Sequence, residues 1–163
     1  MLEEITQLLR DSALREAVVW LLFNVPGLPP ILQSIHIVTV AVIVGTIGLT
    51  HLRILNVALL AQDPLDLVRR YQSVLSWALL VALITGVAFV IARPGRYFLN
   101  PVAGGKFAFL ALAVLFTYWA FGYLKKGGLD WRVRALSGFS VVAWVGVIFG
   151  GRWIAYVDYL YWD

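Results

Sequence analysis

The sequence predicts an all-α integral membrane protein, with residues 1–163 forming a single domain built as a four-helix bundle of up-down-up-down topology. Hydrophobic residues make up 61% of the chain and charged residues only 13%, whereas a soluble domain has about 45–50% and about 25% respectively. Four apolar runs are each long enough to cross a bilayer, which takes roughly 20 residues. The connections between these runs are short, which favours antiparallel neighbours.

The N-terminal segment, residues 1–25, predicts an amphipathic helix that lies along the membrane surface. Its apolar positions, among them Ile5, Leu9 and Val18, favour one hydrophobic side. The segment opens with two acidic residues and has no continuous apolar core, so it does not resemble a signal peptide. A short helix packed against the rest of the protein is an equally good interpretation.

Turn residues separate the four predicted spans. The first span follows the sequence VPGLPP and is long enough to tilt or to extend beyond the membrane. The sequence DPLD begins the second span, with Asp66 as its predicted N-cap. The sequence RPGRYFLNPVAGG marks a turn region before the third span, and the fourth runs into the aromatic tail YVDYLYWD. The predicted spans are residues 31–61, 67–92, 106–124 and 131–156.

The distribution of basic residues predicts the orientation of the bundle. The side with both termini and the 93–106 loop carries six Lys or Arg and six acidic residues, which cancel. The side with residues 53–70 and 125–134 carries seven Lys or Arg and three acidic residues, and seven minus three accounts for the whole net charge of +4. Because cytoplasmic loops are enriched in Lys and Arg, we expect residues 53–70 and 125–134 in the cytoplasm and both termini outside.

The composition excludes several kinds of site. The chain has no cysteine, which excludes disulfides, thiolate metal sites, iron–sulfur clusters and covalently attached c-type haem. It also lacks the clusters of Met, Cys or His that copper handling requires. No GxSxG, HExxH or phosphate-loop motif is present, so the sequence leaves open whether the protein is an enzyme. We expect the lipid bilayer as its main partner and no interaction with nucleic acid.

Three ionisable side chains at membrane depth, His36, His51 and Arg152, define the candidate site. Such groups are costly in lipid and usually face the bundle interior, a cavity or a partner. In an antiparallel bundle His36 and Arg152 have similar depth, with Lys106 at the start of the third span on the same side. His51 lies about 22 Å further along the first span, beside Arg53 and roughly 60° from the azimuth of His36. One stripe of this helix therefore presents a histidine near each membrane surface.

The pattern favours the binding of b-type haem. His36 and His51 are the candidate axial ligands, or ligands of another metal, and Arg152, Lys106 and Arg53 are the candidate partners of the haem propionates. Two such sites would carry electrons across the membrane, in exchange with a redox or quinone partner. Two bis-histidine haems need four histidines, and the chain has two. The hypothesis therefore requires either a symmetric homodimer or haem with a single histidine ligand.

Other interpretations of the same residues stay open. A membrane histidine often bonds a hydroxyl or carbonyl of a neighbouring helix, and Arg152 can extend towards the membrane surface among aromatic residues. One alternative function is a transporter or carrier subunit for a small anion or metal, in which Arg152 and Lys106 hold the anion. Another is a structural subunit of a larger membrane complex. The hydroxyl groups available to the histidines are those of Ser34, Thr39, Thr46, Thr50, Ser73, Ser76, Thr85, Ser137 and Ser140.

Small residues in the spans predict close contact between helices. Gly146 and Gly150 form a GxxxG pair in the last span. Such pairs let two helix backbones approach closely in lipid. The pair is compatible with packing inside the bundle and with a homodimer.

The apolar segments also resemble a known family. The sequences IHIVTVAVIVGTIGLTHLRIL, NPVAGGKFAFL and SVVAWVGVIFGGRWIAY are similar to the helices of an uncharacterised bacterial family of small four-helix integral membrane proteins, and GRWIAY is the most specific element. That family is similar in architecture to the membrane domains of copper-resistance D-type proteins, some of which are thought to bind haem or metal. The resemblance covers residues 31–156 and implies a multi-pass protein of the bacterial inner membrane. The residues to which it points are His36, Lys106, Gly151 and Arg152, with Asn100 and Pro101 shaping the turn before Lys106.

Overall fold

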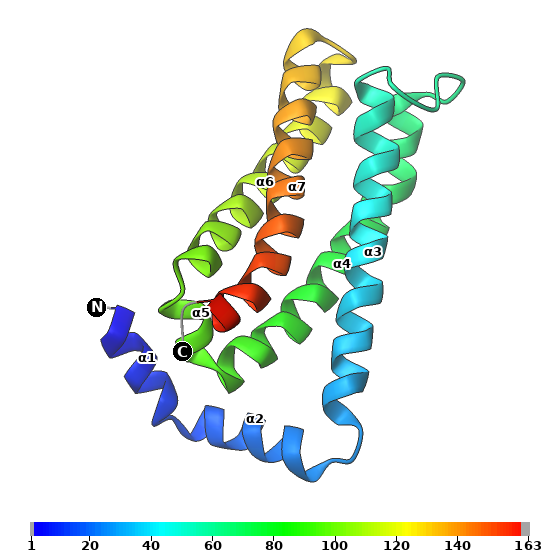
Figure 1. Ribbon diagram of the computed structural model, residues 1–163. Coiled ribbons are helices and arrows are strands. Elements are labelled where there is room, and N and C mark those ends of the chain that lie inside the picture. Colours follow the sequence, from blue (N-terminus) through cyan, green and yellow to red (C-terminus); the bar gives the residue numbers. More distant parts are fainter. Residues whose placement is uncertain (1, 161–163) are drawn as a thin grey trace.

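The computed structural model describes residues 2–160, and all secondary structure in that range is α-helical. Four long helices form an antiparallel bundle with short helices at one end (Figure 1). The four are long and apolar enough to cross a membrane, which confirms the predicted all-α, multi-pass architecture. Residues 161–163 of the aromatic tail lie outside the described residues, as do the side chains at 155 and 157–160. The helices are α1 (Leu2–Arg10), α2 (Ala13–Asn24), α3 (Leu28–Ile54), α4 (Pro64–Ala92), α5 (Pro94–Phe98), α6 (Pro101–Gly127) and α7 (Trp131–Leu160).

A capping residue followed by proline starts both α4 and α6. The Asp63 carboxylate accepts hydrogen bonds from two backbone N–H groups, at 2.7 and 3.1 Å, and Pro64 follows it. Asn100 caps α6 in the same way through one bond of 2.9 Å, before Pro101. Proline suits the first turn because its missing N–H has no helical partner there. Both helices therefore begin earlier than predicted, and the prediction of Asp66 as N-cap was wrong.

The first long helix is displaced towards the N-terminus relative to the predicted span of residues 31–61. Two prolines lie in the first turn of α3, so the VPGLPP sequence leads into the helix instead of only preceding it. At the other end, Asn56 and Leu59 have φ angles of 60° and 56°. A positive φ is incompatible with a right-handed helix, so residues 55–63 form a loop although they are largely apolar.

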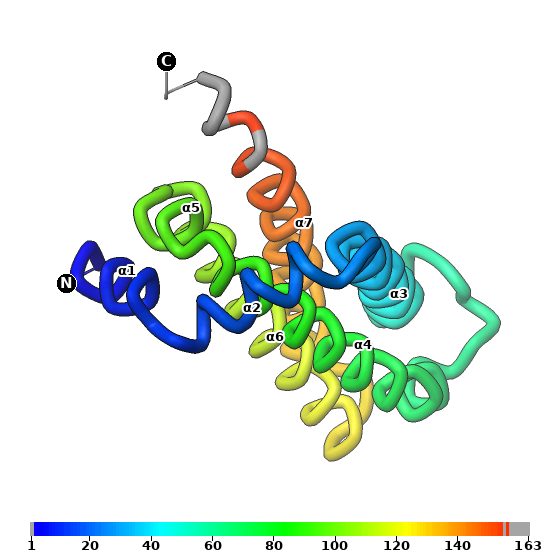
Figure 2. Tube along the Cα trace, turned by 90° about the horizontal axis from the view of Figure 1, so that it is seen from below, coloured from blue at the N-terminus to red at the C-terminus, as the bar shows by residue number. Residues whose placement is uncertain are grey.

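The N-terminal segment forms two helices, so the prediction of a single helix over residues 1–25 was wrong. Ser12 separates them: its hydroxyl donates to the Leu9 carbonyl at 2.7 Å and accepts from the Arg15 N–H at 3.2 Å. The second bond makes Ser12 the N-cap of α2. Figure 2 shows α1 and α2 extending across the end of the bundle, where α1 contacts α5 and α2 contacts α3 and α4.

The long helices pack as two antiparallel pairs, α3 with α4 and α6 with α7, with fewer contacts between the pairs. Gly146 and Gly150 of α7 face α6. A Cβ atom on Gly146 would lie 2.8 Å from the ring of Phe109, and one on Gly150 would lie 3.1 Å from the Cβ of Lys106. The GxxxG pair is therefore occupied inside this chain, where it brings α6 and α7 close together.

The hydrophobic core lies in the half of the bundle next to the α3–α4 and α6–α7 loops, which we call the closed half. Polar contacts also join the two helix pairs here: the hydroxyls of Ser76 and Tyr118 are 2.7 Å apart, and Lys125 donates to the Gln72 side-chain oxygen. The closed half is thus held by both apolar packing and polar bridges. Its core residues are Ile43, Ile47, Ile54, Val68, Leu75, Ala78, Ala113, Phe121, Leu124, Val133, Ala143 and Trp144.

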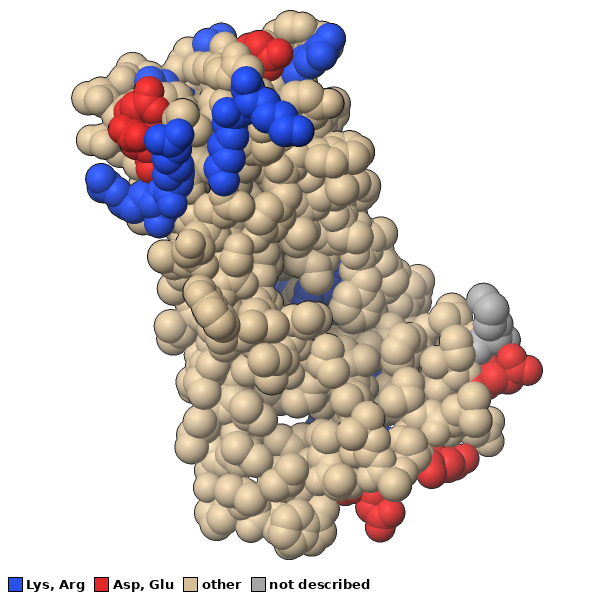
Figure 3. All heavy atoms as spheres, turned by 180° about the vertical axis from the view of Figure 1, so that it is seen from behind, with Lys and Arg blue, Asp and Glu red and all other residues tan. Residues whose placement is uncertain are grey.

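The other half of the long helices, next to α1, α2 and α5, is more open, and we call it the open half. Its buried residues among those described are Thr39, Thr85, Ala103 and Ile154. Figure 3 shows hollows in the surface, with Lys or Arg atoms visible inside them, away from the charged ends of the molecule. The same view shows many Lys and Arg side chains gathered at the closed end, which the charge pattern predicts to face the cytoplasm.

Candidate functional site at His36

His36 lies in the open half, on the face of α3 that contacts α4. Its Nδ1 atom is 2.8 Å from the Thr85 hydroxyl, and its ring meets that of Phe89 edge-on, with centroids 6.5 Å apart. Gly86 provides space beside the ring, because a Cβ atom there would lie 3.4 Å from the imidazole Cε1. Residues on two adjacent turns of α4 thus surround the His36 ring, which is itself half-buried.

The hydrogen bonds of Thr85 favour a proton on Nδ1 of this ring. The Thr85 hydroxyl donates to the Val81 carbonyl at 2.8 Å, with the Ala82 carbonyl at 3.2 Å. A hydroxyl has one hydrogen to donate, and when that hydrogen goes to a carbonyl of α4, the hydroxyl oxygen accepts from the Nδ1–H of His36. In the neutral imidazole this leaves the lone pair on Nε2. A histidine that donates from one nitrogen and offers the other is the usual arrangement of a metal or haem ligand.

Lys106 of α6 is the second predicted site residue in the open half. It is half-buried and packs on two glycines of α7: a Cβ atom on Gly151 would lie 3.4 Å from the Lys106 Nζ. The positive charge of Lys106 lies within electrostatic range of the His36 ring. The structure therefore places His36 and Lys106, from different helix pairs, in the same half of the bundle, with Gly151 beside Lys106.

Arg152 does not join this pair, although the sequence pattern places it at the same depth. Its side chain is exposed, its guanidinium donates to the Tyr156 hydroxyl at 3.2 Å, and its central carbon lies 5.3 Å from the centre of that ring. Both contacts are within α7. The arrangement agrees with the alternative in which Arg152 extends outward among aromatic residues.

His51 is in the closed half and is completely buried, at 0% exposure. Its Nε2 lies 3.2 Å from the Ser140 hydroxyl and 3.4 Å from that of Thr117, and its ring stacks on Phe121 with centroids 5.4 Å apart. Its Nδ1 has no hydrogen-bond partner among the described residues. Nε2 faces these hydroxyls and Nδ1 is itself buried, so neither nitrogen is accessible to a haem iron and the residues around His51 do not fit that cofactor.

Thr117 is the centre of this buried cluster, and the sequence interpretation did not single it out. Its hydroxyl lies 2.7 Å from that of Ser140 and accepts from the Trp144 indole N–H at 3.1 Å. It also donates to the Ala113 carbonyl at 2.7 Å. A lone threonine in an apolar helix is a weak signal, because its hydroxyl can be satisfied within its own helix.

Arg53, the remaining predicted propionate partner, is engaged in the α3–α4 loop. It donates to the Gln62 carbonyl at 2.5 Å and to the Asn56 side-chain oxygen at 2.7 Å. These bonds explain how the loop closes after α3. Arg53 thus stabilises the loop at the closed end. His36, in contrast, lies in the open half.

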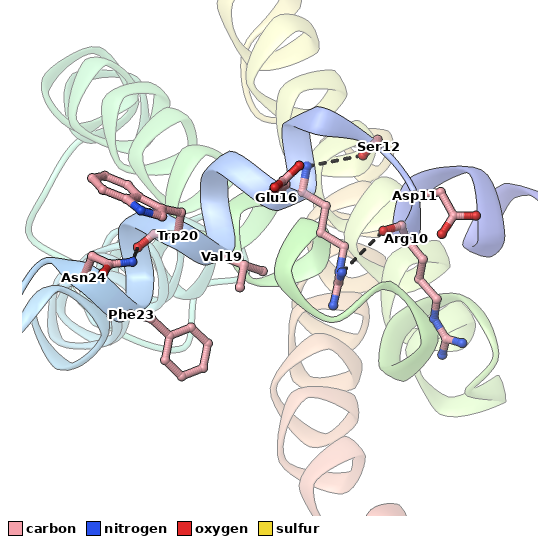
Figure 4. Close-up of a pocket in the computed structure, with 9 residues that line it drawn as sticks. Arg10, Asp11, Ser12, Glu16, Val19, Trp20, Phe23 and Asn24 are labelled. Atoms are coloured by element: carbon pink, nitrogen blue, oxygen red, sulfur yellow. Dashed lines mark hydrogen bonds between the residues drawn. The ribbon is translucent and has the colours of Figure 1, made fainter.

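Two shallow hollows are formed elsewhere on the described surface. One, of about 480 Å³, lies at the α1–α2 junction, where the Arg15 guanidinium donates to the Arg10 carbonyl at 3.3 Å (Figure 4). It contains none of the predicted site residues. The other lies between α3 and α4 and is lined mainly by apolar side chains. Within the described residues, no group of three or more His, Cys, Asp or Glu is arranged to hold a metal ion.

Comparison with known proteins places the chain in one family. The profile of DUF6644, a family of unknown function, matches residues 28–157. No curated protein and no solved structure matches the chain. The matched segment begins at the first residue of α3 and includes nearly all of α7, so it contains the four long helices and the open half with His36 and Lys106. The chain therefore belongs to the DUF6644 family of unknown function.

Proposed function

We propose that this membrane protein binds b-type haem in its open half, with His36 as the axial ligand. The observation that carries the proposal is the hydrogen bond from His36 Nδ1 to Thr85, which directs the lone pair to Nε2. Haem bound there supplies reversible one-electron transfer. Lys106 is the candidate partner for a haem propionate, because it is a cation on the opposite helix pair near His36.

Of the two histidines, only His36 has surroundings that fit haem. The open half has apolar walls and few buried side chains, whereas the stacked and sealed ring of His51 leaves no room for a porphyrin. We therefore propose one haem per chain instead of a pair that spans the membrane. His36 would hold the haem either as its single protein ligand or together with His36 of a second chain in a homodimer, so one histidine per chain is enough.

The visible spectrum of the full-length protein purified in detergent tests this proposal. We expect a Soret band that shifts on reduction with dithionite, and we expect His36→Ala to lose it. Thr85→Val, which removes the partner of Nδ1, should weaken haem binding by about 10–100-fold. Thr85→Ser keeps the hydroxyl and is the matched control.

Thermal unfolding in the same detergent shows whether each protein is folded, and the spectra are compared only among folded proteins. A wild-type protein that is folded, colourless and unable to take up added hemin contradicts haem binding. So does a His36→Ala variant that remains folded and keeps the Soret band unchanged. Equal effects of Thr85→Val and Thr85→Ser would contradict the role assigned to the hydroxyl.

A second candidate function is the transport of a small anion, and the position of Lys106 favours it. The half-buried ammonium group has no acidic partner among the described residues. A buried cation without a counter-ion attracts an anion. Anion uptake into proteoliposomes that is lost in Lys106→Met, from a protein without haem, would support this alternative over the first.

A further inference from the structure

We propose that the groove between α3 and α4 binds an anionic phospholipid, with an acyl chain in the groove and the headgroup at Arg70. The proposal concerns the outer face of the α3–α4 pair and is independent of haem binding at His36. It rests on the shape of the groove and on the charge at its end.

The groove has a volume of about 420 Å³. Its floor is formed by the small residues Thr39 and Ala78, which are 9% and 8% exposed, and larger side chains such as Trp77, at 68% exposure, form its walls. The Thr39 hydroxyl donates to the Ile35 carbonyl at 2.7 Å, so the floor presents no unsatisfied donor. Such a surface suits a hydrocarbon chain. The full lining is Val38, Thr39, Val42, Ser73, Val74, Trp77, Ala78 and Val81.

Arg70 continues the same face of α4 towards the closed end. The positions 70, 73, 74, 77 and 81 follow the i, i+3, i+4, i+7 pattern of one helix face. From 73 to 81 the lining extends about 12 Å along the helix, and Arg70 is about 4.5 Å beyond it. This distance places the guanidinium where the headgroup of a lipid lies when its acyl chain fills the groove.

The positive charge of Arg70 is not neutralised by another described residue of the protein. Arg69 and Arg70 are exposed, and no hydrogen bond or ion pair joins either of them to another described residue. Asp66 is one turn further towards the loop and forms no ion pair with Arg70. A guanidinium is well suited to a phosphate oxygen, so an anionic headgroup complements this end of the groove.

The charges of Arg69 and Arg70 also favour a lipid over a second copy of the chain as the occupant of the groove. Two copies inserted in the same membrane have the same orientation, so a two-fold interface on this groove would place their Arg69 and Arg70 side chains at the same level. Like charges facing each other are unfavourable. An anionic lipid removes this repulsion.

Native mass spectrometry of the full-length protein with added phosphatidylglycerol or phosphatidylcholine of identical acyl chains tests the proposal. We expect tighter binding of phosphatidylglycerol, and Arg70→Gln should weaken that binding about fivefold. Asp66→Asn should strengthen it, because the nearby negative charge is removed. Arg134→Gln makes the same charge change at the same end of the bundle but on α7, and it should leave the affinity unchanged.

The groove itself is tested by Ser73→Phe, which fills it from an exposed position and should weaken the binding of both lipids. Leu80→Phe adds bulk to an exposed residue of α4 outside the lining and is the control. Equal affinity for the two lipids, or equal losses in Arg70→Gln and Arg134→Gln, would overturn the proposal. A dimer that Ser73→Phe converts to a monomer would show that a second chain occupies the groove.

Discussion

Thr117 shows how much a single hydroxyl contributes to the closed half. It accepts from Trp144, contacts Ser140 and lies near His51, so residues from three helices depend on one oxygen atom. In a membrane protein the bilayer provides no water to replace a lost partner. The cluster therefore stabilises one arrangement of α3, α6 and α7 relative to each other.

We predict that Thr117→Val lowers the free energy of unfolding by about 1–3 kcal/mol, because the buried Trp144 indole N–H loses its acceptor. Valine keeps the shape of threonine, so packing changes little. Ser76→Ala is the comparison, since its bond to Tyr118 is exposed and its loss should cost less. Chemical or thermal unfolding in detergent measures both. A stability of Thr117→Val equal to wild type would show that the cluster contributes little.

At the scale of the helices, the most instructive feature is the position of proline. Prolines in VPGLPP, DPLD and FLNPVAGG suggest breaks between spans, yet the structure places all of them except Pro26 in the first turns of α3, α4 and α6. A cap residue such as Asp63 or Asn100 immediately before the proline is the signal that distinguishes a helix start from a turn. For that reason these helices begin at earlier residues than the predicted spans.

The contact between α6 and α7 gives a prediction at the same scale. Gly146→Leu should destabilise the protein by about 1–3 kcal/mol, because even a Cβ atom would be 2.8 Å from the Phe109 ring. Gly138→Ala on the same helix is the control, since a Cβ atom there meets nothing within 4 Å. Alanine at that position should be neutral or slightly stabilising. Unfolding in detergent measures the stability of both variants. Equal stability of Gly146→Leu and Gly138→Ala would contradict this account.

At the scale of the whole molecule, the two helix pairs are joined in one half and more open in the other. Apolar packing and polar bridges such as Ser76–Tyr118 hold the closed half. The open half contains His36 and Lys106, a costly pair in lipid unless a ligand or water accompanies them. The packing thus separates a structural half from a half available for binding.

The charge distribution predicts which end faces the cytoplasm, and the absence of cysteine makes the test simple. We expect Lys126→Cys, in the α6–α7 region, to react with a membrane-impermeant maleimide only from the cytoplasmic side. Glu16→Cys, on α2, should react only from outside. Both residues are exposed, so labelling of intact cells and inverted vesicles distinguishes the two orientations. The reverse pattern would show that the small excess of Lys and Arg does not decide the topology.

The sequence by itself determined the membrane class, the number of spans and the presence of two histidines in the first span. Hydropathy and length are local properties, summed along each helix without knowledge of its neighbours. The tertiary structure alone decided that His51 is fully buried, that Arg152 turns outward and that Lys106 lies in the same half of the bundle as His36. The physical reason is that no local pattern in α3 shows which partner helix each residue contacts, although Thr39, Thr46, Thr50 and His51 mark its buried side. The rotation of such a helix depends on its partners, and these are known only when the pairs have packed.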